Sequence, residues 1–184
     1  GDSDYEFTIQ SVSKVATYLC VLENYGLKDI KNHVGVKASS RAFNSIIELE
    51  LSNKNIPVNP FINAGAIVCT SMLFQKYGDE AFDLILNKLR AMTNNKNLSY
   101  SEATFESERA TSCSNRALTY MMMQSNIIPQ DVDVERLLSI YFKCCSILVT
   151  AVDLANMSYT LSNDGVNLSG EKVSDEKYIR AVRT

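Results

Sequence analysis

The sequence predicts a mainly α-helical fold, because most of its apolar residues recur at the three- and four-residue spacing of an amphipathic helix. The clearest patterns of this kind cover residues 11–24, 79–92 and 131–143. Strand-like alternation is confined to short stretches, of which residues 5–9 are the best example. With 184 residues, 46% of them hydrophobic and 21% charged, the chain can form one domain with a substantial core.

The first half is expected to contain two strong helices separated by a stretch without a clear period. Residues 11–24 form the first helix, which Gly26 ends, and one or two more turns can follow it. Within the irregular stretch, residues 46–51 fit either a strand or a short helix. The second helix covers residues 63–77. In the run Ala-Gly-Ala at 64–66 the glycine costs helix propensity, and such small residues indicate close approach of another backbone or helix.

The second half is expected to be a series of helices, over residues 79–92, 99–109, 117–123, 131–143 and 150–162. Residues 145–149 continue the apolar pattern, so the fourth of these helices is either extended and bent or followed by another. Thr150 and Asp153 match the capping box that begins a helix. Residues 166–173 fit a turn or a small hairpin, and Ser174 is expected to cap a last helix.

Composition excludes several classes of partner and site. The formal net charge of −3 gives no basic surface for nucleic acid, and no apolar run is long enough to span a membrane. Five cysteines without a Cys-x-x-Cys pair indicate free thiols in a reducing compartment, so we expect a cytoplasmic protein. The single histidine, His33, excludes a His-rich metal site, and no motif indicates a metal or a cofactor.

A serine at the junction of the first strand and the first helix carries the best candidate chemistry. Lys14 follows Ser11 by three residues, so the two side chains share one face of a helix. A partly buried amine with a lowered pKa can remove the hydroxyl proton and make the serine a nucleophile. Ser-x-x-Lys occurs twice more after residue 168, however, and Ser11 could instead be a helix N-cap beside a solvated lysine.

Three further polar residues are candidates for ligand binding, and each could instead be a helix cap or solvated surface. Asn63 precedes the small residues of the second helix; the sequence favours an N-cap there over a side chain aimed at a ligand. Glu108 and Asn115 are seven residues apart, about 20° from eclipsed on one continuous helix. The interruption at residues 111–114 weakens that geometry, and each residue alone indicates solvated surface.

Several motifs, taken in order, resemble the serine-dependent glutaminases. They are Phe7-x-Ile9-Gln10-Ser11-x-Ser13-Lys14, Phe43-Asn44-Ser45, Asn59-Pro60-Phe61-Ile62-Asn63-Ala64-Gly65-Ala66-Ile67, Ser107-Glu108 with Asn115-Arg116, and Leu138-x-x-Tyr141-Phe142-x-x-Cys145-Ser146. The block at residues 59–67 is far more specific than Ser-x-x-Lys. The resemblance covers residues 1–184 without large gaps.

This resemblance implies the helical portion of a β-lactamase/penicillin-binding-protein-like α/β fold, with most of the central sheet absent from this chain. It also implies hydrolysis of L-glutamine to L-glutamate and ammonia without a cofactor. Ser11 would be the nucleophile and Lys14 its base. The residues that match substrate-binding positions are Ser11, Asn63, Glu108, Asn115 and Tyr141.

The implied roles agree with the chemistry of glutamine. A carboxylate such as Glu108 suits the substrate ammonium, whereas amide and hydroxyl groups suit its carboxylate. Tyr141 would bind substrate and also act catalytically, by passing protons to the leaving ammonia.

The sequence departs from the family in two respects. Ser112-Cys113-Ser114 stand where the family commonly has Gly-Asp-Arg, so the loop before Asn115 is expected to differ in shape. By the resemblance, residues 1–184 are expected to be an internal fragment of a single domain, incomplete at both ends. We then expect exposed apolar surface, self-association as a dimer or tetramer, and little activity of the chain alone.

Two alternatives to a glutaminase remain. The first is another serine acylase of the same fold, which acts on a β-lactam or a peptide. The second is a non-catalytic helical interaction domain, in which Ser11 would be only a cap.

Overall fold

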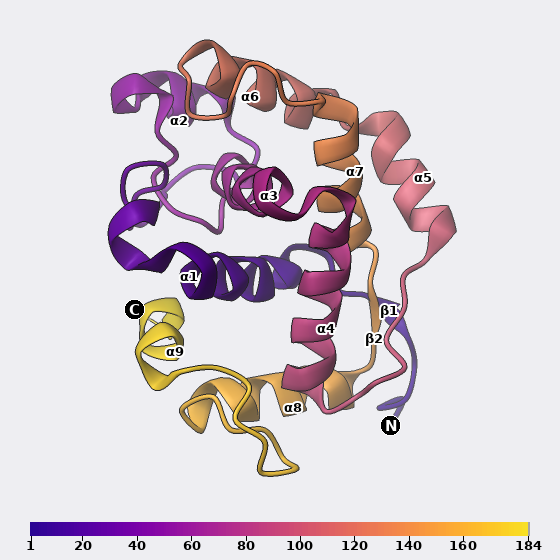
Figure 1. Cartoon of the computed structure of the whole chain (residues 1–184). Coiled ribbons are helices and arrows are strands. Elements are labelled where there is room, and N and C mark those ends of the chain that lie inside the picture. Colours follow the sequence, from indigo (N-terminus) through magenta and orange to yellow (C-terminus); the bar gives the residue numbers. More distant parts are fainter. Residues whose placement is uncertain (184) are drawn as a thin grey trace.

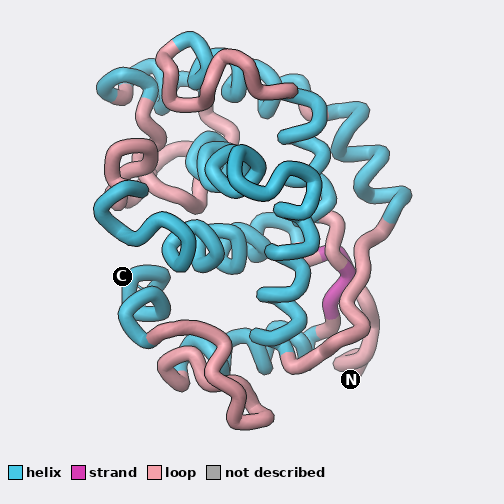
Figure 2. Tube along the Cα trace, in the orientation of Figure 1, coloured by secondary structure: helices cyan, strands magenta, loops and turns pink. Residues whose placement is uncertain are grey.

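A computed structural model describes residues 1–183 of the chain. These residues form mostly helices joined by loops, and strand is confined to one short pair (Figure 2). Strand β1 (Phe7–Thr8) runs antiparallel to β2 (Leu148–Val149), with Phe7 opposite Val149 and Thr8 opposite Leu148. The expectation of a mainly α chain is therefore confirmed.

The α-helices of the described chain, in order, are α1 (Lys14–Ile30), α2 (Ile46–Leu51), α3 (Asn63–Tyr77), α4 (Ala81–Thr93), α5 (Glu102–Thr111), α6 (Cys113–Gln124), α7 (Val134–Cys145), α8 (Ala151–Ser162) and α9 (Glu176–Arg183). The 3₁₀ helices are η1 (Gln10–Ser13), η2 (Asn53–Asn55) and η3 (Gly78–Glu80). Helices α1, α3, α4 and α7 pack against one another at the centre (Figure 1). Helices α8 and α9 cover one end of this group, and α2 and α6 lie at the other.

Helix α3 is the most enclosed element. Every residue from Ala64 to Leu73 is buried, so the helix has no solvated face over these residues. A helix that is apolar on all sides is stable only when other elements surround it. Helices α1, α4, α6 and α7 all contact α3, which explains why its first turn lies so near the centre of the molecule.

The first helix differs from the sequence expectation at its start. A 3₁₀ turn, η1, precedes it and contains Ser11, and the α-helix itself begins at Lys14. Gly26 interrupts the helix as expected, at φ +73° and ψ +162°, and the additional helical residues after it continue to Ile30. Residues 46–51 form the helical alternative, α2, which Ser45 caps by accepting from the Glu48 N–H.

The second half agrees with the expected helices except where one ends. Helix α7 stops at Cys145 and strand β2 follows, so neither an extension of α7 nor a second helix occupies residues 146–149. The predicted capping box of α8 is confirmed, with both Thr150–Asp153 contacts present. Ser174 does not cap the last helix, because α9 begins at Glu176 and Asp175 is the residue directly before it; the Ser174 hydroxyl donates to Glu23.

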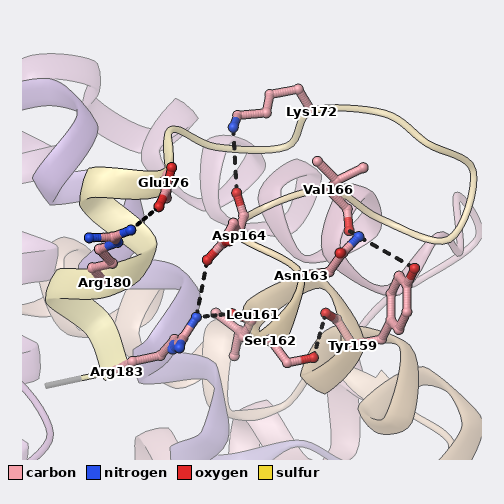
Figure 3. A network of polar contacts seen from close by, with 10 residues as sticks. All are labelled: Tyr159, Leu161, Ser162, Asn163, Asp164, Val166, Lys172, Glu176, Arg180 and Arg183. Carbon is pink, nitrogen blue, oxygen red and sulfur yellow. Dashed lines mark hydrogen bonds and ion pairs between the residues drawn. The ribbon is translucent and has the colours of Figure 1, made fainter.

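Polar contacts close the connection between α8 and α9 (Figure 3). Arg183 of α9 donates to Asp164 Oδ1 and to the Leu161 carbonyl, both at 3.3 Å. Val166 and Lys172 form an isolated antiparallel bridge, in agreement with the turn or hairpin expected there. Exposed ion pairs of this kind contribute little free energy each, so this network orients α9 more than it stabilises the fold.

The cysteines are free, as the sequence indicated. Cys113 is exposed, whereas the other four are buried: Cys20, Cys69, Cys144 and Cys145. Across residues 1–183, no helix combines the length and the apolar character needed to cross a membrane.

Candidate active site

A pocket of about 490 Å³ lies where η1, the loop before α2 and the start of α3 meet. The residues that line it are Ser11, Arg41, Ala42, Phe43, Asn44 and Asn63. Two of the residues predicted for the site, Ser11 and Asn63, therefore share one pocket although 52 positions separate them in the sequence.

The 3₁₀ turn η1 places Ser11 and Lys14 on the same side of the chain. A 3₁₀ helix has three residues per turn, so side chains at i and i+3 eclipse each other. Ser11 is exposed, and it is not the N-cap of either helix: Ile9 precedes η1 and Ser13 precedes α1. The alternative of Ser11 as an N-cap is therefore wrong.

Lys14 is not a solvated lysine, since only 2% of it is exposed. Its Nζ donates to the Phe61 carbonyl at 3.1 Å and to Asn63 Oδ1 at 2.7 Å, and it lies 5.4 Å from the centroid of the Phe43 ring. Burial lowers the pKa of Lys14 from 10.5 to about 8, and the nearby Cys145 opposes this shift. An appreciable fraction of the amine is therefore neutral near pH 7.

Asn63 joins the lysine to a third helix. It is the first residue of α3, whose N-cap is Ile62, and its side chain makes no capping hydrogen bond. The favoured interpretation of Asn63 as an N-cap is thus wrong. Its Oδ1 accepts from Lys14, and its Nδ2 donates to Asn115 Oδ1 at 3.1 Å. A hydrogen-bonded row, Lys14–Asn63–Asn115, consequently connects α1, α3 and α6.

Glu108 and Asn115 lie on different helices. Ser112 separates α5 from α6 with φ −86° and ψ +53°, so the geometry of one continuous helix does not apply. Asn115 is only 8% exposed, which corrects its interpretation as solvated surface, and Glu108 is half-buried. The negative φ of Ser112 also means that serine fits there without a glycine-like backbone conformation.

Tyr141 is buried on α7, with 5% of it exposed. Burial raises its pKa well above 10, and negative charge at Cys145 or Glu108 would raise the pKa further. Tyr141 is therefore protonated at neutral pH and available as a hydrogen-bond donor. Burial likewise raises the pKa of Cys145 to about 11, although Lys14 opposes that shift. Cys145 thus interacts with both residues: its side chain is hydrogen-bonded to Tyr141, and it interacts electrostatically with Lys14.

The sequence did not single out Arg41, which lines the same pocket as Ser11. Across the part of the chain that the structure describes, Arg41 makes no ion pair. It lies in a stretch without periodicity, so no local pattern indicated its position. In residues 1–183, no three His, Cys, Asp or Glu side chains gather as they would around a metal ion.

Known proteins match the whole chain. A family model described as Glutaminase matches residues 1–184. Curated proteins named Glutaminase from Clostridium tetani (strain Massachusetts / E88) and Clostridium botulinum (strain Loch Maree / Type A3) are each 40% identical to it. These two matches cover 100% of this chain but 60% of each relative, so the chain spans about 60% of their length.

Solved structures agree with the sequence comparison. A crystal structure of Bacillus glutaminase in the presence of 4.3 M NaCl matches with a TM-score of 0.92 and 31% identity, over 99% of this chain and 60% of that one. The Bacillus subtilis probable glutaminase gives a TM-score of 0.89 at 31% identity, over 99% of this chain and 58% of that one. The fold that the motifs implied is therefore confirmed.

Proposed function

Because the chain belongs to the glutaminase family, we propose that the protein hydrolyses L-glutamine to L-glutamate and ammonia through a serine acyl-enzyme. The observation that carries this proposal is the buried Lys14 amine, held by two acceptors and one helical turn from an exposed serine at a pocket. A lysine in solution would be protonated and could not act as a base at neutral pH.

The two acceptors determine what the neutral amine can do. A neutral lysine has two N–H bonds and one lone pair in a tetrahedral arrangement. The Phe61 carbonyl and Asn63 Oδ1 take the two N–H bonds, which leaves the lone pair to accept. Since η1 places Ser11 on the same side as Lys14, this lone pair would accept a hydrogen bond from the Ser11 hydroxyl.

Substrate recognition is proposed for the residues around this pair. Glu108 would bind the glutamine ammonium as the carboxylate among them. Asn115 uses Oδ1 to accept from Asn63, so its Nδ2 can donate to the substrate carboxylate. Tyr141, protonated at neutral pH, would donate to substrate and to the leaving group.

The reaction then takes two steps. Ser11 Oγ attacks the side-chain amide carbon while Lys14 takes the hydroxyl proton; the C–N bond breaks, and nitrogen leaves as ammonia with a proton from Lys14 or Tyr141. Water hydrolyses the resulting glutamyl ester of Ser11 and releases glutamate. Backbone N–H groups of the first turn at Ser11 would stabilise the negative charge that forms on the carbonyl oxygen.

Replacement of either member of the pair tests the proposal. In the full-length protein, Ser11→Ala and Lys14→Ala are each expected to lower kcat/KM for glutamine by about 10³-fold or more, and the double variant by about the same factor. The two residues act as one unit, so their effects do not add. Initial rates of ammonia or glutamate release measure the loss.

The chain contains its own matched control for this test. Ser169→Ala and Lys172→Ala change the same Ser-x-x-Lys spacing at a site far along the chain, and we expect near wild-type rates from both. Unchanged glutamine turnover in Ser11→Ala would remove Ser11 from catalysis. Turnover of a chromogenic β-lactam in place of glutamine would instead favour another serine acylase.

A further inference from the structure

The turn at residues 59–62 is fixed by the side chain of its first residue. Asn59 Oδ1 accepts from the backbone N–H groups of Phe61 at 2.9 Å and Ile62 at 3.1 Å. Asn59 Nδ2 donates to the Lys37 carbonyl at 2.9 Å, which ties the turn to the neighbouring segment. One amide side chain therefore orients two peptide groups immediately before α3.

Two further contacts hold the same turn. A Cβ on Gly65 would lie 1.9 Å from the Asn59 carbonyl oxygen, so the turn lies directly against the first turn of α3. The Phe61 ring packs edge-on against Tyr18 of α1, with the ring centroids 5.8 Å apart. The Phe61 peptide is consequently held from both sides, with its carbonyl 3.1 Å from Lys14 Nζ.

We propose that Asn59 is a positioning residue, which holds the Phe61 carbonyl against Lys14 so that the lysine lone pair is directed at Ser11. The inference rests on the proposed function, since it assigns Asn59 to the same Ser11–Lys14 pair. Asn59 does not line the pocket that contains Ser11. Its hydrogen bonds reach Lys14 only through the Phe61 peptide, so Asn59 is not itself catalytic.

The groups around Lys14 allow the Phe61 carbonyl to affect the protonation of the Lys14 amine. Lys14 faces Cys145 from α7, which is neutral at pH 7, and the Phe43 ring from the loop before α2. No carboxylate contributes to the shift of its pKa. The Phe61 carbonyl is one of the two oxygen atoms that accept from Lys14 Nζ, and a hydrogen bond to the ammonium favours the protonated amine.

Replacement of Asn59 tests this assignment through the titration of Lys14. In Asn59→Leu the Phe61 and Ile62 N–H groups lose their acceptor, and the Phe61 carbonyl is no longer held. Loss of one acceptor disfavours the ammonium, so the pKa of Lys14 should fall by about half a unit or more. The measurement is NMR titration of the ¹³Cε signal in lysine-labelled full-length protein, with Lys14→Arg used to assign the signal.

Kinetics provide a second readout. We expect Asn59→Leu to lower kcat by about tenfold or more with a smaller change in KM, because the base is misdirected while the pocket-lining side chains remain. Asn59→Ser keeps a hydroxyl that can accept from the turn N–H groups, so it should recover part of both effects. This variant also serves if Asn59→Leu folds poorly.

Asn167 offers a matched control elsewhere in the fold. Its Oδ1 accepts from the backbone N–H groups of Ser169 and Glu171, both at 3.0 Å, and its Nδ2 donates to the Ala91 carbonyl at 3.0 Å. The hydrogen-bond pattern is the same, but it lies beside α4 and α8. Asn167→Leu should therefore lower the melting temperature without moving the pKa of Lys14.

The possible outcomes distinguish a role of Asn59 in positioning Lys14 from a role in fold stability alone, and both from a failure of the proposed function. The proposal is supported if the Lys14 pKa falls in Asn59→Leu, recovers in part in Asn59→Ser and is unchanged in Asn167→Leu. An unmoved Lys14 pKa in Asn59→Leu, with a stability loss like that of Asn167→Leu, would reduce Asn59 to a structural residue. If the shift occurs in a protein that does not hydrolyse glutamine, the positioning stands and the proposed function fails.

Discussion

Lys14 is the residue on which the proposed chemistry most depends, because its amine is buried yet keeps two hydrogen-bond acceptors. Burial disfavours the charge and lowers the pKa, and the nearby Cys145 opposes this shift. The result, a pKa of about 8, keeps the amine close to the protonation state that a general base requires at neutral pH.

The activity should therefore depend on pH with a definite sign. Only the neutral amine can accept the Ser11 proton, and lowering the pH through about 8 converts Lys14 to the ammonium. We expect kcat/KM for glutamine to fall about tenfold per pH unit below this point and to level off above it. A pH–rate profile from 6 to 9.5 checks this, and a flat profile would exclude Lys14 as the base.

At the scale of the element, the first turn of α3 brings the site residues together. This turn supplies Asn63, and the Asn59 carbonyl approaches its backbone at Gly65 more closely than a side chain would allow. A helix interior normally disfavours glycine, so this residue serves the packing of the turn rather than the propensity of the helix.

Gly65→Ala is expected to destabilise the protein strongly, because its Cβ would lie 1.9 Å from a backbone oxygen that cannot move without displacing the turn. We expect the free energy of unfolding to fall by about 3 kcal/mol. Gly170→Ala is the control: its φ is +78° but no atom lies within 4 Å of the added Cβ, so only about 1–2 kcal/mol of backbone strain is expected. Equal losses in urea unfolding would contradict this reason for Gly65.

At the scale of the whole molecule, a partly buried polar contact joins the helical centre to the last segment. Lys88 of α4 donates to Glu23 of α1 at 2.9 Å and to the Val173 carbonyl at 2.9 Å, and Ser174 donates to the same glutamate. The Lys88 and Glu23 side chains are 14% and 26% exposed. The segment that precedes α9 is thus attached to α4 and α1 by hydrogen bonds to the two members of one ion pair.

Lys88→Met should remove the cation beside Glu23, which keeps only the Ser174 hydroxyl as a donor, and should leave the Val173 carbonyl without the Lys88 donor in a partly buried environment. We expect a loss of about 2 kcal/mol in the free energy of unfolding. The ion pair of Arg136 with Asp79 is the comparison: its side chains are 56% and 71% exposed, so Arg136→Met should cost much less than Lys88→Met. Similar losses in the two variants would show that burial does not strengthen the Lys88 contact.

The sequence by itself determined the mainly helical fold, the capping box of α8, the close approach at Gly65 and the spacing of Ser11 and Lys14. These features depend on local periodicity, on propensity and on residues within one turn of each other. The ordered motifs also indicated the family, which the comparisons show.

Only the tertiary structure decided what Asn63 contacts, that Arg41 lines the pocket with Ser11, and that a strand follows α7. A local pattern favours a cap for Asn63, but Lys14 and Asn115 approach from other helices and take both ends of its amide. Strand β2 exists because β1, more than 130 residues earlier in the chain, pairs with it. Contacts between distant segments override local preference, and no pattern within a single helix contains them.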